Sequence, residues 1–312
     1  MRKPYEPPLL QATKWIGTAA GIAGAILIAL NIGFVHYGFV LFLISSVLWT
    51  AAAAAQREPA LLVLQGVFAI IDVVGVRAAL AVSDYVLVSV PPEGSGDPVL
   101  TACGAALSHG PQLSAIVYLS TIGVYGNHDG AWVDEESECR PGSQRSLQRR
   151  VAEQAWQDFG ARTGLPVAIL RLAGIYGPGQ NALVNLKSGT ARRIRKPGQI
   201  FNRIHVTDIA RAIDAAFDRR ADGIFNVTDD EPSPPEDPIA FAAELLGVEA
   251  PPIIPFEDAR DSMSSFALSF YADVKRAMNT KLKSALGVTL EFPTYREGLT
   301  ALHLDCRSRK NS

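Results

Sequence analysis

The sequence predicts an α/β protein in which a partial, doubly wound parallel sheet follows an all-α transmembrane domain of two or three helices. Two observations predict this class. The segment from Trp15 to Gln56 contains no Asp, Glu, Lys or Arg, and it is long enough to cross a bilayer more than once. After about residue 80, short apolar runs alternate with amphipathic stretches, as in a parallel sheet covered by helices. We therefore expect a transmembrane domain over 1–80 and an α/β domain over 81–312.

Three apolar spans are predicted near 16–34, 37–55 and 60–76. The third span contains Gln65 and Asp72, and a carboxylate is costly in lipid, so a topology with only two spans remains open. The hydropathy predicts a multi-pass membrane protein of the bacterial inner membrane, whose partner is the lipid bilayer.

The basic residues near the N-terminus decide the predicted orientation. Arg2, Lys3 and Lys14 favour an inside N-terminus, so two spans keep the α/β domain inside and three place it outside. A cleaved signal peptide is the alternative interpretation, because these residues resemble its basic first region. The apolar stretch is too long for that, and a second span follows within a few residues.

Charge and cysteine content exclude other classes. The formal net charge is -2 and the sequence pI is about 6.2, which argues against a nucleic-acid partner, since such proteins carry a basic surface. The three cysteines, Cys103, Cys139 and Cys306, are odd in number and far apart. They predict neither a disulfide framework nor a metal site.

The predicted elements of the α/β part follow in order along the chain. The helix over 145–163 carries Leu147, Val151, Ala155 and Phe159 at helical spacing on a charged background. The strands are expected at 84–90, 113–120, 166–172 and 224–227, and the helices at 97–108, 145–163, 210–217 and 238–246.

Three motifs in this part carry a family resemblance. They are YLSTIGVYG at 118–126, RLAGIYGPG at 171–179 and RIHVTDIA at 203–210. In this order they resemble the extended and atypical short-chain dehydrogenase/reductase superfamily, the NAD-dependent epimerase/dehydratase family. The resemblance covers about 83–302 and is strongest to an atypical branch with an R-x-x-x-R-x-x-x-E helix. It implies a Rossmann-type sheet, NAD(P), oxidoreductase or epimerase chemistry, and a small, sugar-nucleotide-like substrate.

The resemblance implies catalytic positions on one strand end and one helix. Thr121, with Ser120 beside it, occupies the position of the hydroxyl that binds the substrate oxygen. At the positions of the tyrosine and lysine that form the family's acid/base pair, this sequence has Arg145 and Arg149. Glu153 follows four residues after Arg149. Arginine stays protonated, so these residues can bind an anion but cannot shuttle a proton. The alternative is that both arginines lie on a solvated helix face.

The resemblance also assigns cofactor and substrate positions. Tyr125, Asn181 and His205 are the candidates for substrate binding, although packing is an alternative for Tyr125 and His205. Tyr176, like Tyr125, could replace the missing acid, and Asp208 is expected to cap a helix. The cofactor positions are Ser89, Val90, Pro91, Leu172, Ala173, Gly174 and Ile175.

One expected element of the family is missing from the sequence. No strand followed by a G-x-G-x-x-G turn, which would place the pyrophosphate at a helix N-terminus, precedes the strand at 84–90. This predicts weak or absent NAD(P) binding and an exposed edge strand at which copies of the chain could associate. Two alternatives to an enzyme with a degenerate site are therefore open: a non-catalytic interaction module on a membrane anchor, and the product of a gene fusion or deletion.

Overall fold

The structure is a computed structural model that describes residues 82–308, apart from 95 and 111. The chain divides into two compact units, one comprising 1–84 with 103–113 and the other 85–102 with 114–312. All the strands of the described residues lie in the second unit. The predicted domain boundary near residue 80 remains a prediction.

A parallel four-stranded sheet forms the centre of the second unit, with the strand order β1-β2-β4-β8. The strands are β1 (Tyr85–Val88), β2 (Ala115–Thr121), β4 (Val167–Leu172) and β8 (Gly223–Val227). Each of the three pairings is parallel, so each connection must cross over the sheet. All six residues of β4 are buried, as expected for a central strand covered on both faces. The predicted parallel α/β sheet is therefore confirmed.

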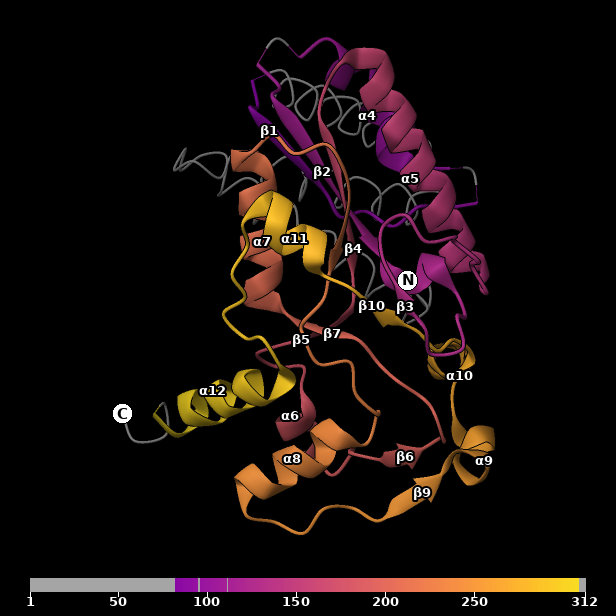
Figure 1. The fold of residues 1–312 in the computed structure, drawn as a ribbon, viewed down its shortest axis with the longest axis vertical. Helices are drawn as coiled ribbons and strands as arrows, with labels where there is room; N and C mark the ends of the chain where they lie inside the picture. The colour runs from indigo at the N-terminus through magenta and orange to yellow at the C-terminus, as the bar shows by residue number, and fades with distance from the viewer. Residues whose placement is uncertain (1–81, 95, 111, 309–312) are drawn as a thin grey trace, which may run out of the picture. The chain divides into compact units, whose positions relative to one another are not determined.

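Helices cover both faces of this sheet (Figure 1). Helix α5 (Gln144–Thr163) packs on β2 and β4 from one side. On the other side lie α7 (Val206–Asp218) and α11 (Thr280–Leu286), with Ala212, Phe225 and Leu282 in one apolar core.

The buried face of α5 matches its apolar spacing only in part. Phe159 is buried as predicted, but Leu147 and Val151 are 45% and 55% exposed, whereas Glu153 and Trp156 are completely buried. The reason is that two polar partners lie beneath the helix: Arg171 of β4 pairs with Glu153, and the Trp156 indole donates to Asp97 Oδ2. Internal polar pairs therefore decide the rotation of this helix.

The remaining elements build the region beyond the strand ends and the connections to it. Figure 1 shows the helices α6, α8 and α12 grouped below the sheet, where Leu183, Ala242 and Leu299 share a separate core. The elements are α4 (Pro98–Ser108), η1 (Ile122–Tyr125), β3 (Trp132–Val133), β5 (Gly174–Tyr176), α6 (Ala182–Lys187), β6 (Arg193–Arg195), β7 (Arg203–His205), α8 (Asp237–Leu246), β9 (Ile253–Pro255), α9 (Phe256–Ala259), η2 (Arg260–Ser262), α10 (Ser265–Ala272), β10 (Arg276–Ala277) and α12 (Tyr295–Ser308).

The predicted fold class needs a correction, and with it the predicted membrane location. Within residues 82–308, no helix combines the length and the apolar content needed to cross a membrane. The longest, α5, has 20 residues, but it carries Arg145, Arg149, Glu153 and other charged side chains. The description that these residues support is an α/β fold alone. The spans predicted at 16–34, 37–55 and 60–76 lie outside the described residues.

Strand β1 is the last strand of the sheet on its side among the described residues, where it pairs only with β2. On one face of β1, Tyr85 and Leu87 are 44% and 45% exposed. The Tyr85 ring also lies 4.9 Å from that of Phe217 on α7. Association of copies through this edge remains a prediction.

Candidate active site

The candidate site lies at the carboxyl ends of β2 and β4, where ligands of parallel α/β sheets commonly bind. Thr121 is the last residue of β2 and caps the short helix η1, because its Oγ1 accepts a hydrogen bond from the Gly123 amide at 3.0 Å. No acceptor for the Thr121 hydroxyl hydrogen is found among the described residues, so the hydroxyl can still donate one hydrogen bond.

Gly123 brings the first turn of α5 against this strand end. A side chain at Gly123 would start 3.3 Å from Thr121 Oγ1 and 3.2 Å from Ser146 Oγ. A larger residue at position 123 would therefore have to displace these side chains slightly. The contact places the beginning of α5 beside Thr121.

A buried ionic network lies directly below the strand ends. Glu153 Oε1 accepts hydrogen bonds from Ser120 Oγ at 2.6 Å and from Arg171 Nε at 3.0 Å, and Oε2 accepts from Arg171 Nη2 at 2.7 Å. Burial disfavours the charge on Arg171, but the hydrogen bonds and negative charge of Glu153 outweigh it and hold the pKa of Arg171 above its usual value. Ser120, predicted as catalytic, is thus bound to this network.

The two arginines at the acid/base positions have different surroundings. Arg149 donates from Nη1 to the Leu119 carbonyl at 2.7 Å and to the Tyr118 hydroxyl at 3.0 Å. Arg145 is exposed, with its guanidinium carbon 4.8 Å from the centre of the Phe266 ring.

The predicted substrate-binding residues are buried. The Tyr125 hydroxyl donates to Asn226 Oδ1 at 2.7 Å, and burial raises the pKa of Tyr125 to about 12. Asn181 caps α6, accepting from the Val184 amide and donating to the Gly177 carbonyl. These contacts use both side chains for packing of the fold.

His205 and Asp208 also have internal partners. His205 Nδ1 accepts from the Thr207 amide at 3.2 Å, and burial lowers the pKa of His205. Its Nε2 is buried and lacks a partner among the described residues. Asp208 accepts from the amides of Glu291 and Phe292, so it attaches the C-terminal segment to α7.

The predicted cofactor positions fall into exposed and buried groups. Leu172 and Ala173 are buried, whereas Gly174 and Ile175 are exposed. The segment that follows β1 and contains Ser89, Val90 and Pro91 is exposed as well. The exposed residues come directly after the ends of β1 and β4, the positions expected for residues that contact a ligand across the sheet. Tyr176 is buried, and burial raises its pKa further from neutrality.

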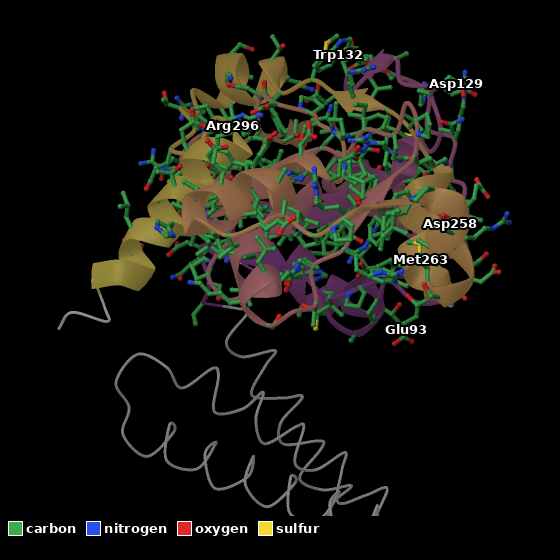
Figure 2. All side chains as sticks on the ribbon, turned by 90° about the horizontal axis from the view of Figure 1, so that it is seen from below. Glu93, Asp129, Trp132, Asp258, Met263 and Arg296 are labelled. Atoms are coloured by element: carbon green, nitrogen blue, oxygen red, sulfur yellow. The ribbon has the colours of Figure 1, made fainter. Side chains whose placement is uncertain are left out.

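A pocket of about 270 Å³ is lined by other residues. Trp132 is 52% exposed and lies at the surface of the unit in Figure 2. None of the predicted site residues lines this pocket. The lining residues are Trp132, Asp229, Asp230, Ala277, Met278, Asn279 and Thr280.

Comparison with known proteins supports the α/β fold and the family resemblance. The sequence profile of the NAD dependent epimerase/dehydratase family matches residues 97–228. This chain carries a domain of that family. A solved structure of a functionally unknown conserved protein from Silicibacter pomeroyi is 47% identical, covers 71% of this chain and 77% of its own, and has a TM-score of 0.66.

Two further relatives have names that state an activity. A Streptomyces protein named 3-diazoavenalumate denitrifying reductase is 30% identical over 147 residues, which are 45% of this chain. This chain matches only 48% of that relative's length. The UDP-glucuronic acid 4-epimerase from Bacillus cereus, solved in complex with NAD, is 18% identical with a TM-score of 0.57, covering 74% of this chain and 77% of its own. That likeness concerns the epimerase/dehydratase fold.

The sequence interpretation missed the roles of two residues in the epimerase/dehydratase domain. Glu153 connects Ser120 to Arg171, although the motif alone gave Glu153 no function. Phe266, far along the chain, lies under Arg145. The role of Glu153 could have been found from Arg171, which is a charged residue within an otherwise apolar strand. A buried charge requires a partner. No local signal points to Phe266.

Proposed function

We propose that the protein is an NAD(P)-dependent oxidoreductase of the epimerase/dehydratase type that works without the family's tyrosine and lysine pair. The observation that carries this proposal is the state of Thr121 and Arg149 at the carboxyl end of β2. The Thr121 hydroxyl has no acceptor for its hydrogen among the described residues, while Arg149 donates to neutral acceptors on the same strand. The site can hold a polar substrate, but it has no side chain at positions 145 and 149 that can give up a proton.

The strand ends fit the nicotinamide end of the cofactor. The exposed Gly174 and Ile175 follow β4, and the exposed Val90 follows β1, so backbone and apolar surface are available there. When bound, NAD(P) accepts or supplies a hydride. The sequence has no glycine-rich phosphate turn, so the pyrophosphate would lack its usual helix N-terminus. We therefore expect weak binding of NADPH, with a Kd above about 100 µM.

The substrate is a small molecule that is reduced or oxidised beside Thr121. The reacting group is a carbon that bears oxygen, or another polar group. The curated relative's name, a reductase, supports reduction, and the B. cereus 4-epimerase supports a sugar-nucleotide-like substrate. The buried states of Tyr125, Asn181 and His205 argue that exposed residues at the strand ends, rather than these three, contact the substrate. This leaves Thr121 as the main hydrogen-bond donor.

The experiment measures NADPH oxidation by the full chain through the change in absorbance. The candidate substrates are a panel of sugar nucleotides and small carbonyl compounds. We expect turnover of at least one compound and its loss in Thr121→Ala, with the unfolding free energy lowered by only about 0.5–2 kcal/mol, the cost of losing the cap of η1. Thr163→Ala, at the exposed end of α5, is the control. Absence of both turnover and NADPH binding would contradict the proposal and favour the alternative, a non-catalytic interaction module.

A further inference from the structure

The two guanidinium groups at the start of α5 have only neutral or aromatic partners among the described residues. Arg145 and Arg149 are four residues apart and therefore lie on the same face of the helix. Within the described residues, no carboxylate pairs with either of them: Arg145 contacts the Phe266 ring, and Arg149 donates to a carbonyl and a hydroxyl. By contrast, their neighbour Arg150 lies 3.9 Å from Glu153.

The position of these charges is unfavourable in the isolated fold. The first turn of α5 contains no acidic residue, and the N-terminal end of a helix already carries a partial positive charge. Two like charges spaced by four residues add repulsion of a few tenths of a kcal/mol. An anion bound between Arg145 and Arg149 would relieve both effects.

The arginine face adjoins the strand-end site. A Cβ at Gly123 would lie 3.3 Å from Thr121 Oγ1 and 3.2 Å from Ser146 Oγ, and Ser146 belongs to the same turn of α5 as Arg145. The Arg149 guanidinium reaches the backbone of β2 at Leu119, two residues before Thr121. The first two turns of α5, which carry both arginines, therefore lie next to the end of β2 that the proposed function places against the substrate.

We propose that Arg145 and Arg149 bind an oxyanion group of the substrate, a carboxylate or a phosphate, beside Thr121. This inference rests on the proposed function, because it takes the strand ends as the substrate site. A guanidinium presents a planar set of donors that matches an oxyanion and remains charged at every accessible pH. Phe266 supports the Arg145 side chain through a cation–π contact.

The test is calorimetric titration of the full chain with inorganic phosphate, and separately with acetate. We expect Arg145→Gln to weaken the binding of the preferred anion about tenfold, as loss of a charged hydrogen bond implies. Arg145→Lys should lose less, and Phe266→Ala should weaken binding a few-fold by releasing Arg145. The matched control is Arg162→Gln, because Arg162 is also exposed on α5 and contacts an aromatic ring, Phe159.

Each outcome has a defined meaning. Loss of anion binding in Arg145→Gln but not in Arg162→Gln supports the site, and preference for phosphate or acetate tells which oxyanion it takes. Equal affinity of Arg145→Gln and wild type for both anions overturns the site. An NADPH titration of the same wild-type protein separates the two proposals: NADPH binding without anion binding overturns the anion site alone. Arg145-dependent anion binding without NADPH binding overturns the proposed function alone.

Discussion

Glu153 is the residue on which the buried polar network at the strand ends depends. Its two carboxylate oxygens accept from Ser120 and from two nitrogens of Arg171, and all three side chains are almost fully buried. Removing one partner of a buried pair leaves an uncompensated charge, which costs more than the pair itself contributes.

We expect Glu153→Gln to lower the free energy of unfolding by about 3–5 kcal/mol. The amide keeps the volume of the side chain but leaves Arg171 without its negative partner. Urea unfolding followed by circular dichroism measures the change. Glu138→Gln removes an exposed pair with Arg140 and should cost at most about 1 kcal/mol. Equal effects of the two substitutions would contradict this account of the network.

Asp229 gives the fold a pH dependence that can be measured. Burial raises its pKa to about 8, although the charge of Arg203 opposes this shift. Its Oδ1 accepts from the Glu231 amide, and its Oδ2 is buried without a partner among the described residues. The folded state therefore holds a proton on Asp229 at pH values at which the unfolded chain has lost it.

The sign follows from this difference in bound protons. The contribution of Asp229 to the free energy of unfolding is complete below pH about 4. It decreases by roughly 1.4 kcal/mol per pH unit as the pH rises to about 8. We expect Asp229→Asn to remove this decrease between pH 5 and about 7.5, with Asp258→Asn, an exposed carboxylate, as the control. Parallel stability profiles of wild type and Asp229→Asn would show that Asp229 is ionised in the folded protein.

At the scale of elements, helix α12 is positioned by the absence of one side chain. A Cβ at Gly298 would lie 2.2 Å from the Tyr176 hydroxyl oxygen and 2.8 Å from the ring carbon that bears it. Tyr176 also donates to the Thr294 carbonyl at 3.3 Å. The helix therefore packs directly on the Tyr176 ring.

We expect Gly298→Ala to displace α12 and to lower the unfolding free energy by about 1–3 kcal/mol, the usual cost of overpacking. Gly104→Ala is the matched control, since Gly104 is also helical and a Cβ there meets no atom of the described residues within 4 Å. The control should raise stability by up to about 1 kcal/mol. A stabilising Gly298→Ala would contradict the close contact.

The elements of the sheet could be predicted from the sequence because their signals are local. Apolar runs such as 166–172 mark buried strands, and β4 covers Val167–Leu172. The rotation of α5 could not be predicted, because Glu153 and Trp156 face inward to partners on other elements. The apolar residues Leu147 and Val151 remain at the surface as a result.

The candidate site was predictable only where a motif fixes a strand end. Thr121 and Ile175 follow from the motifs after β2 and β4. The buried states of Tyr125 and His205 could not be predicted, because their partners, Asn226 and Phe292, come from distant parts of the chain. A sequence motif locates such a residue but does not decide between packing and binding.

At the scale of the whole molecule, the epimerase/dehydratase domain combines a regular strand-end site with an altered set of charges. The resemblance predicts arginines at the acid/base positions, and the sequence has no strand followed by a G-x-G-x-x-G turn before β1. The proposed function therefore relies on the nicotinamide end and on Thr121. The central claim is therefore that NAD(P)H still binds at the ends of β2 and β4.

Calorimetric titration of the full chain with NADPH tests this claim most directly. The variants are Ile175→Asp, which places a carboxylate at the exposed end of β4, and Ile253→Asp, a similarly exposed residue of β9. The account predicts saturable binding with a Kd above about 100 µM that is lost in Ile175→Asp and kept in Ile253→Asp. Absence of binding to wild type, or equal binding to both variants, would contradict it.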